Sequence, residues 1–288
     1  MKKIPIGTLV KGSEDPAAAI GRLSSYGFEC FSIMFWQSIE EVDLFEMVDE
    51  VLAVSERTDT AISSLAVYGN VLDDSECGRR TLQDLSSLIE MAPSFGAPVV
   101  GCFAGRVLGA SVPDSLQRWK AVFSPLAERA EELGVKIAFE NCRLGDTWKR
   151  GKWNIAINPD AWELLFDAIP CTSIGLEWEP CHQLEMCCDT VVQLAQWAPR
   201  VFHVHGKDSR VDHALLASRG LFGAESWHQS CFPGRGDFDW AKAFAILNAH
   251  GYEGTIDIEG WNDRDYCGDR EIAGQVEALR YLKQVRGD

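Results

Sequence analysis

Short apolar runs alternate with longer segments of helical period along most of the chain. The runs have the length and composition of buried strands, and we place eight of them at 4–10, 30–36, 61–68, 99–104, 136–141, 173–179, 201–205 and 255–260. Segments of helical period between them include 81–92, 115–133, 160–168, 189–196, 240–250 and 272–285. This succession of strand–helix units predicts an α/β fold, a single (β/α)8 TIM barrel.

The length of the chain and its even composition favour one domain over residues 1–288. A barrel of this kind takes about 250 residues, and neither a Ser/Pro-rich linker nor a low-complexity tract divides the chain. The longest segment without a regular pattern is 207–236, directly after the seventh predicted strand. Loops at that end of a strand stand on the active-site face of a barrel, so we expect this segment to serve function.

Charge and hydropathy exclude several classes of partner. The formal net charge of −16 opposes binding to phosphate backbones and anionic lipid heads, so we expect neither nucleic acid nor a membrane as a partner. The first residues lack the apolar run of a signal peptide and no stretch reaches membrane-spanning length, which predicts a cytoplasmic protein. The ten cysteines then fit reduced thiols better than a disulfide framework.

Ionisable residues end the last four apolar runs. In barrel enzymes the active site lies at this carboxyl end of the strands. Glu140, Glu179 and Glu259 end three of these runs, and His205 ends the fourth. Successive strand residues point to opposite faces, so if these positions face inward, the four side chains converge from neighbouring strands. Three carboxylates held together in a dry cavity need a cation. With one imidazole they suit Mn²⁺ first, and Mg²⁺, Co²⁺ or Zn²⁺ are also compatible.

The alternative is a structural network in which these glutamates pair with Lys or Arg. Two residues deeper on the same faces lie Glu177, His203 and Asp257, which we predict to support the four from below. Further residues at strand ends are candidates for positioning a substrate. These are Lys207 and Arg210 after the seventh strand, and Trp36, Asn70 and Arg106 from earlier strands.

The segments that follow these strand ends carry a family resemblance. They are 139–142 (FENC), 154–162 (NIAINPDAW), 175–182 (GLEWEPCH), 202–208 (FHVHGKD), 233–240 (PGRGDFDW) and 251–254 (GYEG), which leads into Glu259. In order and placement they resemble the sugar phosphate isomerase/epimerase family of xylose isomerase-like TIM barrels, which includes ketose 3-epimerases and inosose-processing enzymes. The resemblance covers most of the chain and is strongest from 137 to 263.

The resemblance implies metal ligands at Glu140, Glu179, His205 and Glu259, and it places His182 against a substrate oxygen. One position departs from the family, which usually has Asp-Pro-x-His where this chain has Glu179 before Pro-Cys-His. The added methylene moves a carboxylate by about 1.5 Å, the length of a carbon–carbon bond. Metal sites tolerate only small displacements of their ligands, so the identity and affinity of the ion stay open.

The segment after the last glutamate, 260–263, also differs from the family's usual ending and indicates an altered substrate pocket. Trp261 in this segment is a candidate for stacking on the apolar face of a sugar, with ordinary packing as the alternative. The glycines of Gly234–Gly236 are a candidate phosphate cradle. Because the family motif has these glycines whether or not the substrate is phosphorylated, we favour an unphosphorylated sugar or polyol.

The reaction implied by the resemblance is proton abstraction beside a sugar carbonyl, through an enediolate, with Glu140 and Glu259 as the acid/base pair. Return of the proton to the same carbon gives an epimerase, and return to the neighbouring carbon gives an aldose–ketose isomerase. The substrate would be a ketose, an aldose or a cyclitol derivative. Two alternatives stay open: a metal-dependent lyase or dehydratase acting on an oxidised sugar or cyclitol, and a sugar-binding barrel without turnover.

The apurinic endonucleases of the same superfamily are a poor match. They use a histidine-rich cluster of three metals, whereas this chain has six histidines in total and a negative charge that opposes DNA. Similar proteins usually form dimers or tetramers, so we expect a homo-oligomer.

Overall fold

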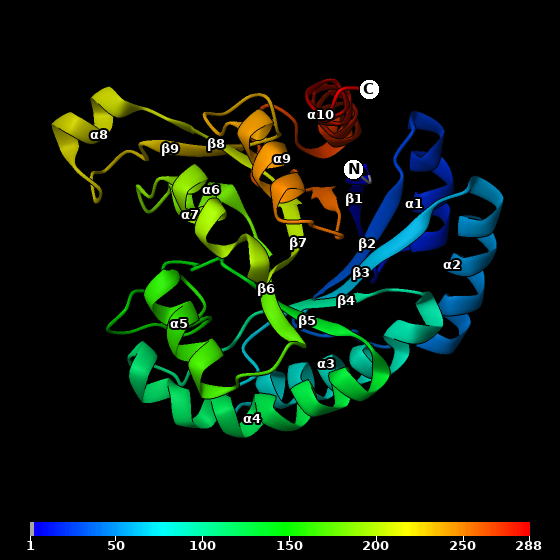
Figure 1. Ribbon diagram of the computed structural model, residues 1–288, viewed down its shortest axis with the longest axis horizontal. Coiled ribbons are helices and arrows are strands. Elements are labelled where there is room, and N and C mark those ends of the chain that lie inside the picture. Colours follow the sequence, from blue (N-terminus) through cyan, green and yellow to red (C-terminus); the bar gives the residue numbers. More distant parts are fainter. Residues whose placement is uncertain (1–2) are drawn as a thin grey trace.

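The computed structural model describes residues 3–288, and its centre is a closed barrel of parallel strands (Figure 1). The barrel strands are β1 (Ile6–Lys11), β2 (Cys30–Trp36), β3 (Ala61–Tyr68), β4 (Val99–Cys102), β5 (Lys136–Glu140), β6 (Ile174–Trp178), β7 (Val201–Gly206) and β10 (Ile256–Ile258). They follow one another around the barrel in chain order, and β10 pairs with β1 to close it. Because every neighbouring pair is parallel, all carboxyl ends meet at one mouth.

Helices surround the barrel and begin and end where local sequence dictates. They are α1 (Pro16–Leu23), α2 (Leu44–Thr58), α3 (Glu76–Phe95), α4 (Val112–Leu133), α5 (Pro159–Ala168), α6 (Pro180–Leu184), α7 (Thr190–Trp197), α9 (Trp240–Ala249) and α10 (Glu271–Arg286), with 3-10 turns at Ser24–Tyr26, Ala198–Arg200 and Gly268–Arg270. The Ser111 side chain accepts a hydrogen bond from the backbone of Asp114 at the start of α4. Gly134, with a φ of 69°, ends the same helix in the left-handed conformation that glycine adopts without strain.

The apolar layer between barrel and helices fixes which strand residues point inward. The Phe139 ring lies 5.0 Å from Phe123 and 5.8 Å from Trp119 of α4, measured between ring centroids, so it points outward into this layer. Side chains alternate along a strand, and Glu140 therefore points into the barrel. The same alternation turns the ionisable residues of β6, β7 and β10 inward.

The predicted barrel is confirmed, and all eight strands form close to the expected positions. The last strand is the shortest, with three residues paired to β1. Helices α1 and α2 were not among the predicted segments. No helix within residues 3–288 is both long enough and apolar enough to cross a membrane.

The prediction that 207–236 lacks regular structure is wrong. This segment holds an antiparallel hairpin of β8 (Asp208–Val211) and β9 (His228–Cys231), with the short helix α8 (His213–Arg219) between them. The hairpin and α8 extend away from the barrel at the upper left of Figure 1. Its strands are short and polar, so they carry little of the hydrophobic alternation by which a strand is found in a sequence.

Candidate metal centre and its pocket

Four ionisable side chains meet at the mouth of the barrel, as the strand ends predicted. Glu140 ends β5, Glu179 follows β6, His205 lies near the end of β7 and Glu259 follows β10. The nearest ligand atoms of the four lie within 4.8 Å of one another, and all four side chains are buried. His205 Nδ1 lies 3.2 Å from Glu259, 3.3 Å from Glu179 and 3.8 Å from Glu140, so the imidazole is the centre of the group.

Two further side chains join this group from the set predicted to contact substrate. Lys207 Nζ lies 2.5 Å from Glu259 Oε1 and 3.4 Å from Glu179 Oε1. His182 Nε2 lies 3.1 Å from Glu179 and 3.6 Å from Glu140. His182 lies on α6, the short helix that begins directly after Glu179, and this places the imidazole between two carboxylates.

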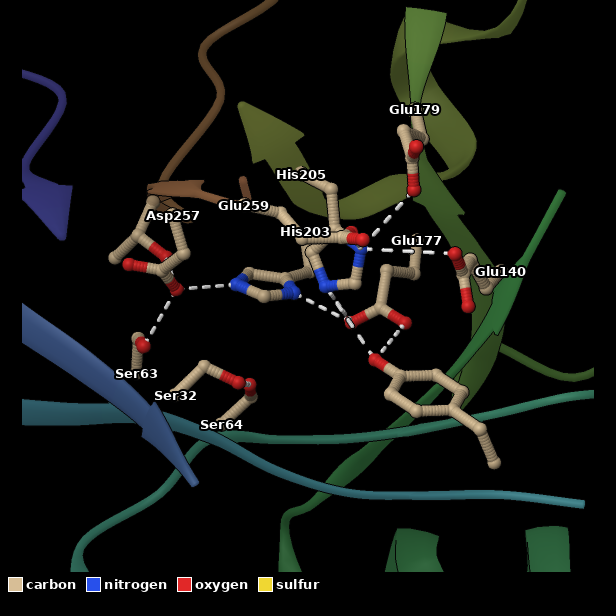
Figure 2. Close-up of polar contacts among 12 residues, drawn as sticks. Ser32, Ser63, Ser64, Glu140, Glu177, Glu179, His203, His205, Asp257 and Glu259 are labelled. Carbon is tan, nitrogen blue, oxygen red and sulfur yellow. Dashed lines mark hydrogen bonds and ion pairs between the residues drawn. The ribbon is translucent and has the colours of Figure 1, made fainter. Parts of the chain in front are cut away.

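A second layer of hydrogen bonds lies beneath the four, and its members are the deeper residues of the same strands. His203 Nδ1 lies 2.6 Å from Glu177 Oε1, and its Nε2 lies 2.5 Å from Asp257 Oδ2. Figure 2 shows the His203 ring between these two carboxylates, next to His205. The hydroxyl of Ser63 donates to Asp257 Oδ2 at 2.6 Å. Each member of this layer is buried and partnered, so the layer can hold His205 and its neighbours in fixed orientations.

Tyr68 belongs to the site and was missed as a site residue in the sequence. Its hydroxyl donates to Glu177 Oε2 at 2.7 Å and lies 3.3 Å from His205 Nε2. The side chain is fully buried, and it reaches the charged cluster from the opposite side of the barrel. The one signal in the sequence was its position as the last residue of a predicted strand, where Trp36 also stands.

Two glycines on nearby strands, Gly101 of β4 and Gly7 of β1, make room for the second layer. A Cβ atom at Gly101 would lie 2.6 Å from Glu177 Oε1, and one at Gly7 would lie 2.0 Å from Asp257 Oδ1. These distances are too short for any side chain, so the carboxylates of β6 and β10 occupy the volume that β4 and β1 leave open.

The carboxyl groups of the site differ in pKa because their surroundings differ. Burial raises the pKa of Glu140 and outweighs the opposing contacts with His182 and His205. Burial acts in the same direction on Glu179, but the charges of His182 and Lys207 outweigh it and hold the pKa of Glu179 well below its usual range. In the second layer, burial is likewise outweighed, and His205 and His203 lower the pKa of Glu177 to about 2.

A pocket of about 160 Å³ opens above the cluster and is walled by aromatic rings. Trp36, Phe103 and Trp261 line it together with Tyr68, and the charged residues form its floor. The Trp36 and Phe103 rings meet edge to face with centroids 6.3 Å apart. Of the predicted substrate contacts, His182, Lys207, Trp36 and Trp261 line this pocket.

Asn70 and Arg106 are not among the residues that line the pocket, although each follows a barrel strand. The Asn70 amide donates to the carbonyls of Arg106 at 2.7 Å and Lys152 at 2.8 Å. The Arg106 guanidinium is buried and donates to the carbonyls of Ala110 at 2.9 Å and Trp148 at 3.2 Å. Both side chains therefore hold the loops above β3 and β4 together.

Arg210 also lies apart from the pocket. It stands on β8, with a side chain that is 44% exposed, and its guanidinium donates to Asp265 Oδ2 at 2.7 Å. The hairpin carries it away from the mouth, which the prediction of an irregular loop did not anticipate.

The donor set fits a divalent metal ion. Three buried carboxylates and one imidazole supply oxygen and nitrogen ligands, which suit Mn²⁺, Mg²⁺, Co²⁺ or Zn²⁺, and the second layer supplies the hydrogen bonds that metal ligands usually have. Glu179 takes part in this group despite its longer side chain, and its backbone lies between β6 and α6 as the N-cap residue of that helix. Lys207, His182 and His205 face the negative charge of three carboxylates, and a bound cation would balance this charge further.

A closed parallel barrel with a buried His/Glu cluster at its carboxyl end defines a TIM barrel that fits a divalent metal at its mouth. Comparison with known families identifies which one. The model of the xylose isomerase-like TIM barrel family matches residues 20–285, and the chain belongs to this family, as the sequence motifs predicted.

Individual relatives are more distant. The chain is 25% identical over 283 residues to YfiH, an uncharacterised protein of Bacillus subtilis, covering 85% of this chain and 87% of YfiH. It is 25% identical over 226 residues to inosose dehydratase of Serratia proteamaculans, covering 72% of each chain. Among solved structures, D-psicose 3-epimerase of Clostridium cellulolyticum aligns with a TM-score of 0.75 at 13% identity, over 98% of this chain and 99% of that one.

Proposed function

We propose that this protein is a metal-dependent sugar isomerase or epimerase that moves a proton beside the carbonyl of a ketose, aldose or cyclitol derivative. The observation that carries the proposal is the placement of Glu140 and Glu259 on either side of His205, at the floor of a pocket with aromatic walls. Two carboxylates that flank one reacting carbon can remove a proton from one face and return it on the other.

The residues of the chain divide the work. Glu140, Glu179, His205 and Glu259 would hold the ion, which we propose to be Mn²⁺. A divalent ion in that position supplies Lewis-acid stabilisation of the negative charge that develops on the sugar oxygens. Glu259 acts as one base, held by the Lys207 ammonium at 2.5 Å, and Glu140 acts as its counterpart beside His182.

The walls would position the sugar. Trp36 and Trp261 offer apolar faces on which the C–H face of a sugar ring or chain can stack, and Phe103 lines the same pocket in edge-to-face contact with Trp36. His182 Nε2, between Glu140 and Glu179, lies where it can donate a hydrogen bond to a substrate hydroxyl.

A dehydratase is the second candidate, and the similarity to inosose dehydratase over 72% of the chain favours it. The first step would be the same proton abstraction beside a carbonyl. The enediolate would then expel a hydroxyl group from the adjacent carbon as water, with the proton supplied by the second carboxyl. The geometry of Glu140 and Glu259 serves both reactions, so the product must decide between them.

The test is incubation of the Mn²⁺-loaded protein with a panel of ketoses, aldoses and cyclitols in D₂O, followed by NMR. Deuterium at an inverted carbon supports an epimerase, deuterium beside a shifted carbonyl supports an isomerase, and loss of water supports the dehydratase. Exchange should fall by about 10²–10⁴-fold in Glu259→Gln and in Glu140→Gln, because each loses a proton-transfer group.

The control for both variants is Glu90→Gln, which changes an exposed glutamate on α3 that pairs with Arg129. It should keep full exchange and full metal content. Absence of exchange across the panel would instead indicate a sugar-binding barrel, and unchanged exchange and metal content in Glu259→Gln would contradict the proposed site. The cytoplasmic location and the homo-oligomer stay predictions.

A further inference from the structure

A second, larger chamber adjoins the pocket above the metal centre. Its volume is about 660 Å³, against about 160 Å³ for the pocket itself. The loop after β5, helix α6, strand β9 and the loop after β10 form its walls. Strand β9 belongs to the hairpin that extends from the mouth, so this addition to the barrel forms one wall of the chamber.

The pocket and the chamber meet at a shared neck. Cys142, Leu144, His182 and Asn262 line both spaces. Leu144 has a φ of 47° and Asn262 a φ of 71°, so both neck loops hold a non-glycine residue in the left-handed region. For leucine this conformation costs roughly 1–2 kcal/mol, and such strain is usually retained where it serves function.

The neck also links the two spaces chemically through the His182 ring. Its Nε2 lies 3.1 Å from Glu179 in the metal centre, and its Nδ1 lies 3.9 Å from Glu185 Oε2 in the chamber. One imidazole therefore faces both spaces, so a molecule that spans the neck would pass directly beside it.

The chamber wall is polar and close to balanced in charge. Glu185 is paired with Arg143 at 2.5 Å and lies 3.8 Å from His228 Nε2. Gln229 and Ser230 of β9 add neutral hydrogen-bonding groups. An anionic group such as a phosphate binds best where positive charge is in excess. The charged residues that line the chamber are Glu185, Asp263 and Arg264, so the two carboxylates offset the arginine and the wall suits hydroxyl groups better.

The walls of the two spaces differ in one more respect. Phe, Tyr and Trp rings surround the inner pocket, whereas none of the described residues that line the chamber is Phe, Tyr or Trp. Ligand sites for small molecules usually measure roughly 300–1,000 Å³, so the inner pocket alone is small and the chamber lies within the usual range.

We propose that the substrate carries a second, polyhydroxylated group beyond the reacting sugar, and that this group, a glycosidically linked sugar, occupies the chamber. The inference rests on the proposed function of the inner pocket and names the class of substrate that it takes. The reacting unit lies against the aromatic walls above Glu140 and Glu259, the link passes His182 in the neck, and the outer sugar binds along β9.

The test compares D-fructose with three disaccharides that carry a glucosyl group on its carbon 3, 4 or 6: turanose, maltulose and isomaltulose. Isothermal titration calorimetry with the Mn²⁺-loaded protein measures each dissociation constant. At least one disaccharide should bind about tenfold more tightly than fructose, because two added hydrogen bonds contribute about 0.5–1.5 kcal/mol each.

Two variants assign this preference to the chamber. In Ser230→Trp the indole fills the space beside β9. The ratio of the dissociation constant of fructose to that of the preferred disaccharide should therefore fall to about one. In Gln229→Ala the wall loses a hydrogen-bonding side chain and the ratio should fall several-fold. The matched control is Ser86→Trp at an exposed position of α3, which should keep the full ratio. Thermal unfolding checks that each variant is folded.

Equal or weaker binding of all three disaccharides overturns the inference, as does a preference that survives in both Ser230→Trp and Gln229→Ala. Deuterium exchange into fructose, followed in the same samples, separates this result from a failure of the proposed reaction. Exchange without a preference for a disaccharide contradicts the proposed role of the chamber and leaves the proposed reaction standing. If the variants reduce a preference for a disaccharide but no sugar exchanges deuterium, the proposed reaction is contradicted and the proposed role of the chamber is supported. If none of the sugars binds, both proposals are contradicted.

Discussion

The two halves of the barrel differ in what they present to its interior. Strands β1 to β4 bring a cluster of buried apolar and aromatic side chains to the mouth, with Trp261 packed against it: Leu9, Met34, Ala66, Tyr68 and Phe103. Strands β5, β6, β7 and β10 bring the ionisable groups: Glu140, Glu177, Glu179, His203, His205, Asp257 and Glu259. One half therefore supplies an apolar wall, and the other supplies the ionisable groups of the candidate metal centre.

The difference shows how the apolar half allows the charged half to hold its ionisable groups close together. An apolar wall keeps water away from the charged half, and interactions among charges are stronger where water is excluded. Small residues in the apolar half, such as Gly7 and Gly101, leave space into which the carboxylates of the charged half fit. The two halves are thus complementary in volume as well as in polarity.

The largest expected effect is a loss of stability, caused by a substitution where a glycine of the apolar half makes room for a carboxylate of the charged half. In Gly101→Ala the new Cβ would lie 2.6 Å from Glu177 Oε1, and Glu177 cannot move without losing its contacts with Tyr68 and His203. We expect the free energy of unfolding in urea to fall by about 3 kcal/mol. The control is Gly21→Ala on α1, whose Cβ would meet its nearest neighbour at 3.4 Å, and which should stabilise the protein by up to about 1 kcal/mol. Equal stability of the two variants would refute this close fit.

A smaller effect is expected where one residue of the apolar half donates to the charged half. Tyr68→Phe removes the hydroxyl that contacts Glu177 and His205, so the proposed ligand His205 loses part of its support. The affinity for Mn²⁺, measured by competition with a chelator, should fall by about 10-fold or more.

The control for this variant is Tyr252→Phe, which removes a hydroxyl that donates to the carbonyl of Thr255 at 2.8 Å. It should lower the free energy of unfolding by about 1 kcal/mol and leave the metal affinity unchanged. If both variants lose metal affinity equally, Tyr68 has no particular link to the metal centre.

The smallest effect is expected at the seam where the halves meet. Arg286 of α10 binds both Glu29 carboxylate oxygens, at 2.6 and 2.8 Å, and the carbonyl of Ile4, so the last helix holds the first strands. Burial opposes ionisation of Glu29, but Arg286 outweighs it and keeps the pKa of Glu29 below its usual 4.5. Glu29→Gln should lower the free energy of unfolding by about 1 kcal/mol at pH 7.

The pH dependence of this effect has a fixed sign. Because the pKa is lower in the folded protein, the stabilisation is complete above pH 4.5 and is lost as the pH falls through the folded value. The difference between wild type and Glu29→Gln should therefore shrink in urea titrations below pH 4.5. Glu132→Gln, which breaks an exposed pair with Arg129, should change stability by less than about 0.5 kcal/mol at either pH.

The sequence predicted the charged half of the barrel better than the apolar half. Glu140, Glu179, His205 and Glu259 each end an apolar run, and the two-residue period of a strand was enough to place them on one face. Tyr68 was missed because an aromatic residue at a strand end has the same pattern whether it packs or donates a hydrogen bond. Asn70 and Arg106 follow strands in the same way, yet their partners are loop carbonyls that the sequence does not reveal.

The order of strands and helices, the closed barrel and the inward direction of the ionisable residues were determined by the sequence, because hydrophobic period and side-chain alternation are local properties. Three features were decided only by the tertiary structure: the fit of Glu177 and Asp257 against glycines, the link from Tyr68 to His205, and the chamber beneath the β8–β9 hairpin. Each joins residues that are far apart along the chain. Their contacts depend on which strands the closed barrel brings together, and no local sequence pattern shows which distant residues meet.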